Sequence, residues 1–184
     1  MKISTCIICC LLLMVSAHSL GAQDQDAASR SARDFVQQFY GWYVPQALNN
    51  HHGSAWDLAL KDKGDEFSPN LLQALKEDSA AQAKVKDDIV GLDFDPFLDT
   101  QDPCKRYELG KITQSGSSYR VEVFSICSGK RQAAPDVVCE VQGNNGQWKF
   151  VNFYYPNMMK DYPNSANLSA MLKLLREERQ KGAH

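Results

Sequence analysis

Histidine and cysteine, which supply many catalytic bases, nucleophiles and metal ligands, are scarce in this chain of 184 residues. Four histidines and six cysteines occur, and the Gly-x-Ser-x-Gly, Walker and His-Glu-x-x-His sequences are missing. Those sequences mark hydrolase nucleophile elbows, phosphate-binding loops and zinc proteases. The adjacent His51 and His52 lie in a polar segment rich in Asn and Gly, which is typical of a solvated loop. The sequence therefore predicts no catalytic residues, no cofactor and no metal site.

An excess of one charge is also missing. The chain has 20 Lys and Arg against 22 Asp and Glu, with both signs mixed along its length. Such a balance does not favour nucleic acid or an anionic membrane as a partner. No Gly/Ser linker divides the chain, so residues 27–160 are predicted to form a single α+β domain, followed by a C-terminal helix and tail at 161–184.

A long apolar run occurs once, from about Cys6 to Ala17. With Lys2 before this run and small residues after it, residues 1–22 have the pattern of a secretory signal peptide. The run is too short to predict a membrane span. Cleavage is expected after Ala22, with Ser19 and Gly21 as alternatives. We therefore expect a periplasmic or secreted protein that is soluble and has no membrane span after cleavage.

Three cysteines remain after the predicted leader is removed, in a compartment that permits disulfides. If a hairpin turns about Ser115 and Gly116, the residue numbers of paired positions sum to 231, which places Cys104 opposite Cys127. Directly opposed residues of antiparallel strands are close enough to form a disulfide. Cys139 would then be the free thiol, and its alternation with two valines predicts that it faces the core.

The periodicity of the apolar residues changes along the chain. Helical spacing predicts one helix over 28–44, ended by Pro45, and a second from Pro69, capped by Ser68. A period of two then predicts four antiparallel strands in a meander, and helical spacing returns from about residue 164. This order predicts an α+β fold, with helices packed on one face of a curved four-stranded sheet. The predicted strands are KRYELGKIT, SYRVEVFSI, DVVCEVQ and QWKFVNFYY.

Four sequence segments carry a resemblance to a known family: FVQQFYGWYV, FSPNLLQAL, DPFLDTQDP and QWKFVNFYYP. They resemble the bacterial exported family catalogued as domain of unknown function 3828, within the nuclear transport factor 2-like (cystatin-like) group. The resemblance covers most of residues 33–156 and implies an N-terminal helix lying across a strongly bent sheet to form a cone. It implies export and carries no catalytic residues across.

The segment GLDFDPFLDTQDPC, residues 91–104, has the composition of a chemical site. Asp93 and Asp95 alternate as in the first half of a calcium loop, but Phe97 and Leu98 stand where the third ligand and the glycine are needed. A pair of catalytic carboxylates is a second interpretation. The favoured interpretation is a turn, in which Asp95 caps the backbone and the two apolar residues anchor the segment in the core.

Aromatic residues on the first helix and the last strand can line the space between helix and sheet. Such a space can be a packed core or a ligand pocket, and packing is the favoured interpretation. If it is a pocket, its predicted ligand-binding residues are Trp42, Tyr43, Trp148 and Tyr154.

The leading functional hypothesis is an exported, non-enzymatic binding module. An open edge or concave face of its sheet would recognise a periplasmic protein, as an inhibitor or immunity protein does, or a small apolar ligand. One alternative is a cone-shaped enzyme acting on an apolar small molecule, with Asp93, Asp95 or Asp136 as base. Another is a structural component of the cell envelope.

Overall fold

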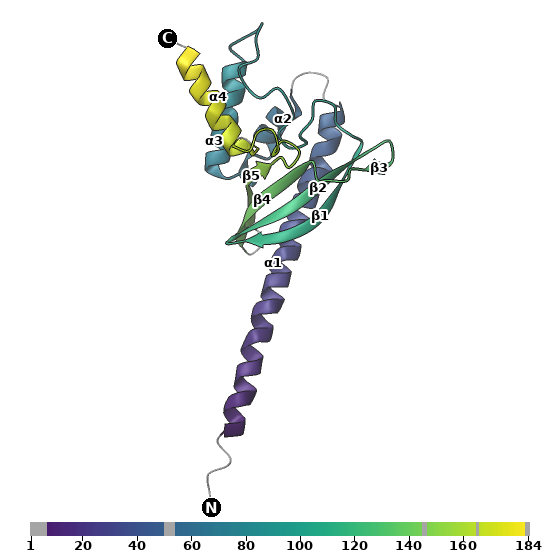
Figure 1. The fold of residues 1–184 in the computed structure, drawn as a ribbon, viewed down its shortest axis with the longest axis vertical. Coiled ribbons are helices and arrows are strands. Elements are labelled where there is room, and N and C mark those ends of the chain that lie inside the picture. Colours follow the sequence, from purple (N-terminus) through teal and green to yellow (C-terminus); the bar gives the residue numbers. More distant parts are fainter. Residues whose placement is uncertain (1–6, 50–53, 145–146, 165, 183–184) are drawn as a thin grey trace, which may run out of the picture.

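The computed structural model describes residues 7–49, 54–144, 147–164 and 166–182 (Figure 1). The fold is α+β: the helices and the antiparallel sheet are separate along the chain, with helices before the sheet and one helix after it. The helices are α1 (Ile7–Asn49), α2 (Ala55–Asp62), the short 3-10 helix η1 (Gly64–Glu66), α3 (Pro69–Gln82) and α4 (Leu168–Gly182). The strands are β1 (Arg106–Ser115), β2 (Ser118–Cys127), β3 (Lys130–Arg131), β4 (Val137–Asn144) and β5 (Gln147–Tyr154).

Helix α1 is longer than predicted at both ends. It begins at Ile7, inside the predicted leader, and its first half extends away from the sheet (Figure 1). The prediction that Pro45 ends the helix was wrong, because α1 continues through Pro45 to Asn49. The hydrogen bond that Pro45 cannot donate is the one to the carbonyl of Gly41, and no other group lies within 4 Å of a Cβ placed on Gly41.

Helix α2 was not predicted, because it directly follows the polar segment that contains His51 and His52. Its apolar residues are nevertheless spaced for a helix, with Ala55, Trp56, Ala59 and Leu60 all buried. The start of α3 agrees with its prediction: Pro69 opens the helix, and the Ser68 hydroxyl accepts a hydrogen bond from a main-chain N–H.

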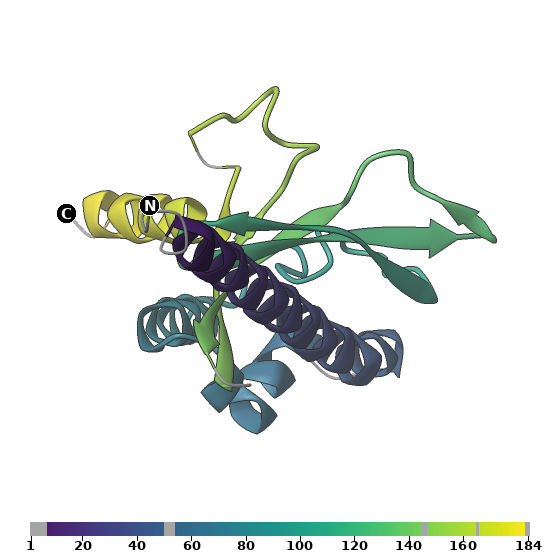
Figure 2. The same ribbon diagram turned by 90° about the horizontal axis from the view of Figure 1, so that it is seen from below.

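The four long strands form the predicted meander, in the order β1, β2, β4, β5, and the two-residue β3 pairs with the end of β2. The predicted register was wrong. Ser115 pairs with Ser118, so the turn is Gly116 and Ser117, and a bulge between Leu109 and Ile112 shifts the rest of β1 by one residue. Gly116 suits this turn because its φ is +61°. The sheet is not strongly curled (Figure 2), in contrast to the bent sheet that the resemblance implied.

The core lies between α1 and one face of the sheet (Figure 2). Aromatic rings fill it: the Phe39 ring packs against those of Tyr43, Phe67, Phe97 and Phe150. None of these five side chains is more than 1% exposed, so this space is a packed interior. Within the described residues, no helix has the length and apolar character needed to cross a membrane.

Candidate functional site

The segment 91–104 is inserted into the core. Phe97 and Leu98 are buried, as predicted. Two buried tyrosine hydroxyls satisfy main-chain carbonyls of the segment: Tyr40 donates to the carbonyl of Phe97 at 2.6 Å, and Tyr155 donates to that of Pro96 at 3.0 Å. The segment is thus held from α1 and from the residue after β5, since its buried carbonyls need such partners.

Asp95 forms the turn that the sequence predicted. Its Oδ1 accepts a hydrogen bond from the Phe97 N–H at 2.9 Å, and its main-chain carbonyl accepts from Leu98 and Asp99. Its Oδ2 accepts from the Tyr43 hydroxyl at 2.5 Å. Burial raises the pKa of the Asp95 carboxyl to about 6, and these hydrogen bonds oppose the rise. Asp95 is therefore a structural residue whose charge costs energy at neutral pH.

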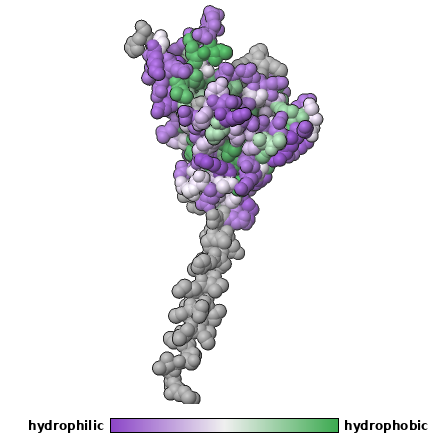
Figure 3. Space-filling model, in the orientation of Figure 1, coloured by the Kyte–Doolittle hydropathy of each residue, from purple (hydrophilic) through white to green (hydrophobic). Residues whose placement is uncertain are grey.

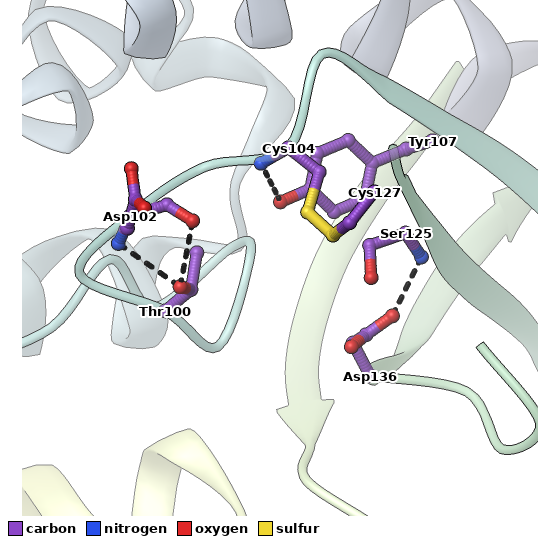
Figure 4. Close-up of a disulfide and its surroundings, with 7 residues drawn as sticks. All are labelled: Thr100, Asp102, Cys104, Tyr107, Ser125, Cys127 and Asp136. Carbon is purple, nitrogen blue, oxygen red and sulfur yellow. Dashed lines mark hydrogen bonds between the residues drawn. A yellow bond between two sulfur atoms is a disulfide. The ribbon is translucent and has the colours of Figure 1, made fainter. Parts of the chain in front are cut away.

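The other acidic candidates are separate from Asp95. The Asp136 carboxylate accepts a hydrogen bond from the Ser125 N–H at 2.6 Å (Figure 4). Asp93 is exposed, and Gln101 donates to its main-chain carbonyl. In the described part of the chain, no group of three or more His, Cys, Asp or Glu side chains is arranged to hold a metal ion. His51 and His52 lie outside the described residues.

The disulfide between Cys104 and Cys127 is present (Figure 4), with Cα atoms 5.2 Å apart. The pairing was predicted from a register that is wrong by one to two residues. It forms all the same, because Cys104 precedes β1 and is not bound by the ladder. The Tyr107 hydroxyl accepts a hydrogen bond from the Cys104 N–H. The bridge ties the end of the segment 91–104 to the end of β2.

Cys139 is the free thiol and is fully buried, as predicted. Its sulfur lies 3.3 Å from the Tyr40 hydroxyl. Burial raises the pKa of the Cys139 thiol to about 12, so the thiolate is not formed at neutral pH. The side chain therefore serves packing.

The four aromatic residues predicted to bind a ligand do not line one pocket, although the ring centroids of Trp42 and Tyr43 lie 6.2 Å apart. Tyr43 and Trp148 are buried, and the Trp148 indole donates to the Ser31 hydroxyl. Trp42 is half-buried, with the Lys63 ammonium 5.5 Å from its ring. The Tyr154 hydroxyl bonds to residues of neighbouring strands, donating to Glu140 at 2.6 Å and accepting from Arg120 at 2.9 Å.

A cleft of about 520 Å³ lies where the end of α1, α2 and the segment 91–104 meet. It is the strongest candidate site, although none of the four predicted aromatic residues lines it. Asp93 and Asp95 do. The other described lining residues are Ala47, Ser54, Ala55, Trp56, Gln82, Ile89, Leu92, Phe94, Thr100, Gln101 and Pro103.

One wall of the cleft is a loop over residues 83–92, which we name the Ile89 loop. Gln82 holds it from inside: its Oε1 accepts from the N–H groups of Val90 and Gly91, and its Nε2 donates to the carbonyl of Asp88 at 2.9 Å. The loop backbone is therefore satisfied by a side chain of α3 rather than by water.

An ion pair between the buried Asp78 and the partly exposed Arg179 holds the end of the Ile89 loop. The Asp78 carboxylate accepts from the Leu92 N–H at 2.8 Å and from Arg179 of α4 at 2.6 Å. Arg179 also donates to the carbonyl of Val90 at 2.7 Å. Position 91 must be glycine, because a Cβ there would lie 2.8 Å from the Asp78 carboxylate.

Ile89 itself is 66% exposed, the highest value among the large apolar side chains whose burial the structure describes, from residue 26 onward. It lines the cleft on one side and, on the other, a groove of about 790 Å³ beside α4. Apolar side chains gather where α4, the end of α3 and this loop meet (Figure 3). The loop thus presents an apolar side chain on a fixed backbone.

Sequence reasoning missed the Ile89 loop. The available signal was an Ile-Val pair placed between aspartates just after a predicted helix, in the sequence DDIVGLD. The apolar residues of this pair do not recur at helical or strand spacing, so the sequence does not predict that they are buried. The hydrogen bonds of Gln82 and Arg179 could not be read from the sequence, because Arg179 lies 101 residues from Asp78.

No family model matches this chain, and comparisons with curated proteins and with solved structures find no match either.

Proposed function

We propose that this chain is an exported, non-enzymatic binding module that recognises a protein partner through the Ile89 loop and the adjoining cleft. An inhibitor or immunity protein that inserts a rigid loop into its target is one form of this function. The observation that carries the proposal is the high exposure of Ile89 on a loop whose backbone is held by Gln82, Asp78 and Arg179.

The cost of this arrangement supports a role outside the fold. An exposed isoleucine adds little to stability, whereas burying the Asp78 carboxylate of the Arg179 ion pair carries a desolvation penalty. A loop that served only as a connection would not need this ion pair. A backbone that is already fixed loses less conformational entropy when it binds, which favours affinity.

The edges of the sheet, an alternative binding surface, are partly occupied. At β1, the Arg33 guanidinium donates to the carbonyls of Leu109 and Gly110 at 2.9 and 2.7 Å. Alongside β5, the Ser68 N–H donates to the carbonyl of Phe150 at 2.8 Å. Addition of a partner strand is therefore less favoured than docking on the Ile89 loop.

The proposal also includes the family and the cellular location of the protein. A helix across one face of an antiparallel meander is the feature that supports a place in the cystatin-like group, while the four sequence segments alone suggest the family of unknown function 3828. The disulfide is consistent with the oxidising compartment that the predicted leader implies. The proposal therefore places the protein in the periplasm or outside the cell.

A photoreactive residue at position 89 tests the function. The full chain carrying benzoylphenylalanine at Ile89 is exported in its host and irradiated, and the same residue at Met159, 48% exposed, is the control. We expect one reproducible protein crosslinked from position 89 and not from position 159. Purified, that protein should bind the wild-type chain and lose affinity for Ile89→Asp. Crosslinks that are identical at both positions would contradict the proposal.

A second candidate function is the cone-shaped enzyme, and one observation favours it. Asp95 lines the cleft, its pKa is raised to about 6, and a tyrosine hydroxyl lies beside it, which are features of a general base. Both carboxylate oxygens already have structural partners, however, and the interior that a substrate would need is filled. Turnover of any ester or ketone that Asp95→Asn abolishes, in a variant of unchanged fold, would favour the enzyme.

A further inference from the structure

We propose that the cleft binds a lysine or arginine side chain of the partner protein, with its charged group beside Asp93 and its aliphatic part over the apolar lining. This inference rests on the proposed function, because it names the chemistry that the same cleft recognises.

The shape and lining of the cleft fit an aliphatic chain that ends in a charge. About 520 Å³ is enough for one long side chain and part of its backbone. The stems of lysine and arginine pack against apolar surface while their charged groups stay near water. The apolar residues that line the cleft are Ala47, Ala55, Trp56, Ile89, Leu92, Phe94 and Pro103.

The charge of the cleft has one sign. Asp93 and Asp95 are the ionisable residues among its described lining, and no Lys or Arg is among them. The groove on the other side of Ile89 differs, since Lys84 and Arg179 there accompany Asp88 and Glu178. Complementary charge therefore assigns a cation to the cleft and no particular charge to the groove.

Asp93 is the carboxylate available to the ligand. Its side chain is exposed and has no hydrogen-bond or ion-pair partner within the described residues. The other polar side chains of the lining are engaged: Gln101 donates to the carbonyl of Asp93, and Thr100 bonds to the backbone of Asp102. Asp95 keeps its own partners and adds a second carboxylate to the lining of the cleft.

Capped amino acids are the probes. The 15N-labelled full chain is titrated with N-acetyl-lysine methylamide and N-acetyl-arginine methylamide, and the Trp56 indole N–H and the Leu92 and Phe94 amides are followed by NMR. The matched neutral probe is the lysine compound acetylated on its Nε. We expect saturable shifts with both charged probes, affinity at least about tenfold weaker for the neutral one, and weaker binding when salt rises from about 50 to about 500 mM.

Asp93→Asn provides the mutational test, and Asp88→Asn, on the neighbouring Ile89 loop, is its control. Asp93 has no described side-chain partner, so the variant keeps its fold, and we expect a loss of about fivefold or more in affinity for the lysine probe. Asp88 does not line the cleft, and an asparagine still accepts from the Ile89 N–H, so Asp88→Asn should bind as the wild type does.

Three results would overturn the inference. Equal binding of the charged and neutral probes would remove the charge preference and leave the cleft as a binding site. Tighter binding of n-butylammonium than of the capped lysine would assign the cleft to a free amine. If no probe shifts the three reporter signals at up to about 50 mM, a concentration at which even feeble side-chain binding is visible, the cleft is not a cation site. The crosslink at Ile89 decides the proposed function in each case.

Discussion

The interior beneath α1 and the Ile89 loop keep their shapes by different interactions. The interior is held by aromatic rings packed against one another. The ring centroids of Phe39 and Phe97 lie 5.5 Å apart, and those of Phe97 and Phe153 lie 5.0 Å apart. The loop is held by hydrogen bonds from Gln82, Asp78 and Arg179. Burial of aromatic rings stabilises the whole domain but is not directional. Hydrogen bonds are directional, so they fix the backbone of the loop while its apolar side chain stays exposed.

This difference shows where the chain is built for stability and where it is built for presentation. A mutation in the interior should lower the free energy of unfolding of the entire domain. A mutation of Gln82, Asp78 or Arg179 should mainly loosen the Ile89 loop. A change at Ile89 should leave the fold almost unchanged. The following variants test that order.

Phe97→Ala should have the largest effect. Its ring is fully buried among other aromatic side chains, so truncation leaves a cavity and lowers the free energy of unfolding by about 3–5 kcal/mol. Phe94, which is half-buried at the cleft, is the matched control and should lose clearly less on truncation to Ala. Urea unfolding followed by tryptophan fluorescence measures both. Equal losses would show that the interior is not specifically packed.

Arg179→Met should come next. Removing one partner of a buried ion pair costs about 3–5 kcal/mol, and because the Arg179 side chain is 20% exposed, we expect about 2 kcal/mol. Hydrogen exchange of the Val90, Gly91 and Leu92 amides should quicken more than that of the β4 amides. Arg176→Met is the control, since Arg176 pairs with the exposed Glu77, and its loss should cost clearly less than the loss of Arg179. If both variants lose the same amount, the buried pair does not hold the loop.

Much of the fold could be predicted because its signals are local. The alternation of β2 and β4, the Ser68 and Pro69 start of α3, and the Asp95 turn each depend on residues close in sequence. The disulfide was predictable because antiparallel neighbours bring Cys104 and Cys127 together even when the register is off by a residue.

The errors have physical causes of the opposite kind. The bulge in β1 depends on Gly110, whose Cβ would collide with the Phe124 ring, and no local pattern reveals that contact. The continuation of α1 past Pro45 to Asn49 likewise has no signal in the local sequence. The cleft escaped prediction for the same reason, since it joins α1, α2 and the Ile89 loop. Of the four aromatic residues predicted to bind a ligand, Tyr43 and Trp148 are buried in the core instead.

Asp95 lies between the two regions, and its titration should affect stability in an unusual direction. Burial raises the pKa of its carboxyl from 3.8 to about 6 in the folded chain, so its stabilising contribution is present below the unfolded value and is lost as pH rises through about 6. The free energy of unfolding should fall by about 1 kcal/mol between pH 5 and 7 on account of this group.

Asp95→Asn separates that contribution from others, because asparagine keeps the acceptor for the Phe97 N–H. Urea unfolding at both pH values should show a smaller fall in the variant than in the wild type. Asp99→Asn is the comparison, since burial and the nearby Asp136 raise the pKa of Asp99 to about 6 as well. An unchanged pH dependence in Asp95→Asn would mean that its carboxylate is better solvated than its position in the structure indicates.

Ile89→Ser should have the smallest effect on stability and the largest on recognition. The side chain is mostly in water, so we expect the free energy of unfolding to change by no more than about 0.5 kcal/mol. Binding to the crosslinked partner should weaken by about tenfold or more, since an exposed apolar anchor contributes only when the partner buries it. Leu174→Ser, a 43% exposed position on α4, is the control for loss of apolar surface alone. A variant that unfolds, or one that binds as the wild type does, would show that Ile89 belongs with the interior and not with the surface that the loop presents.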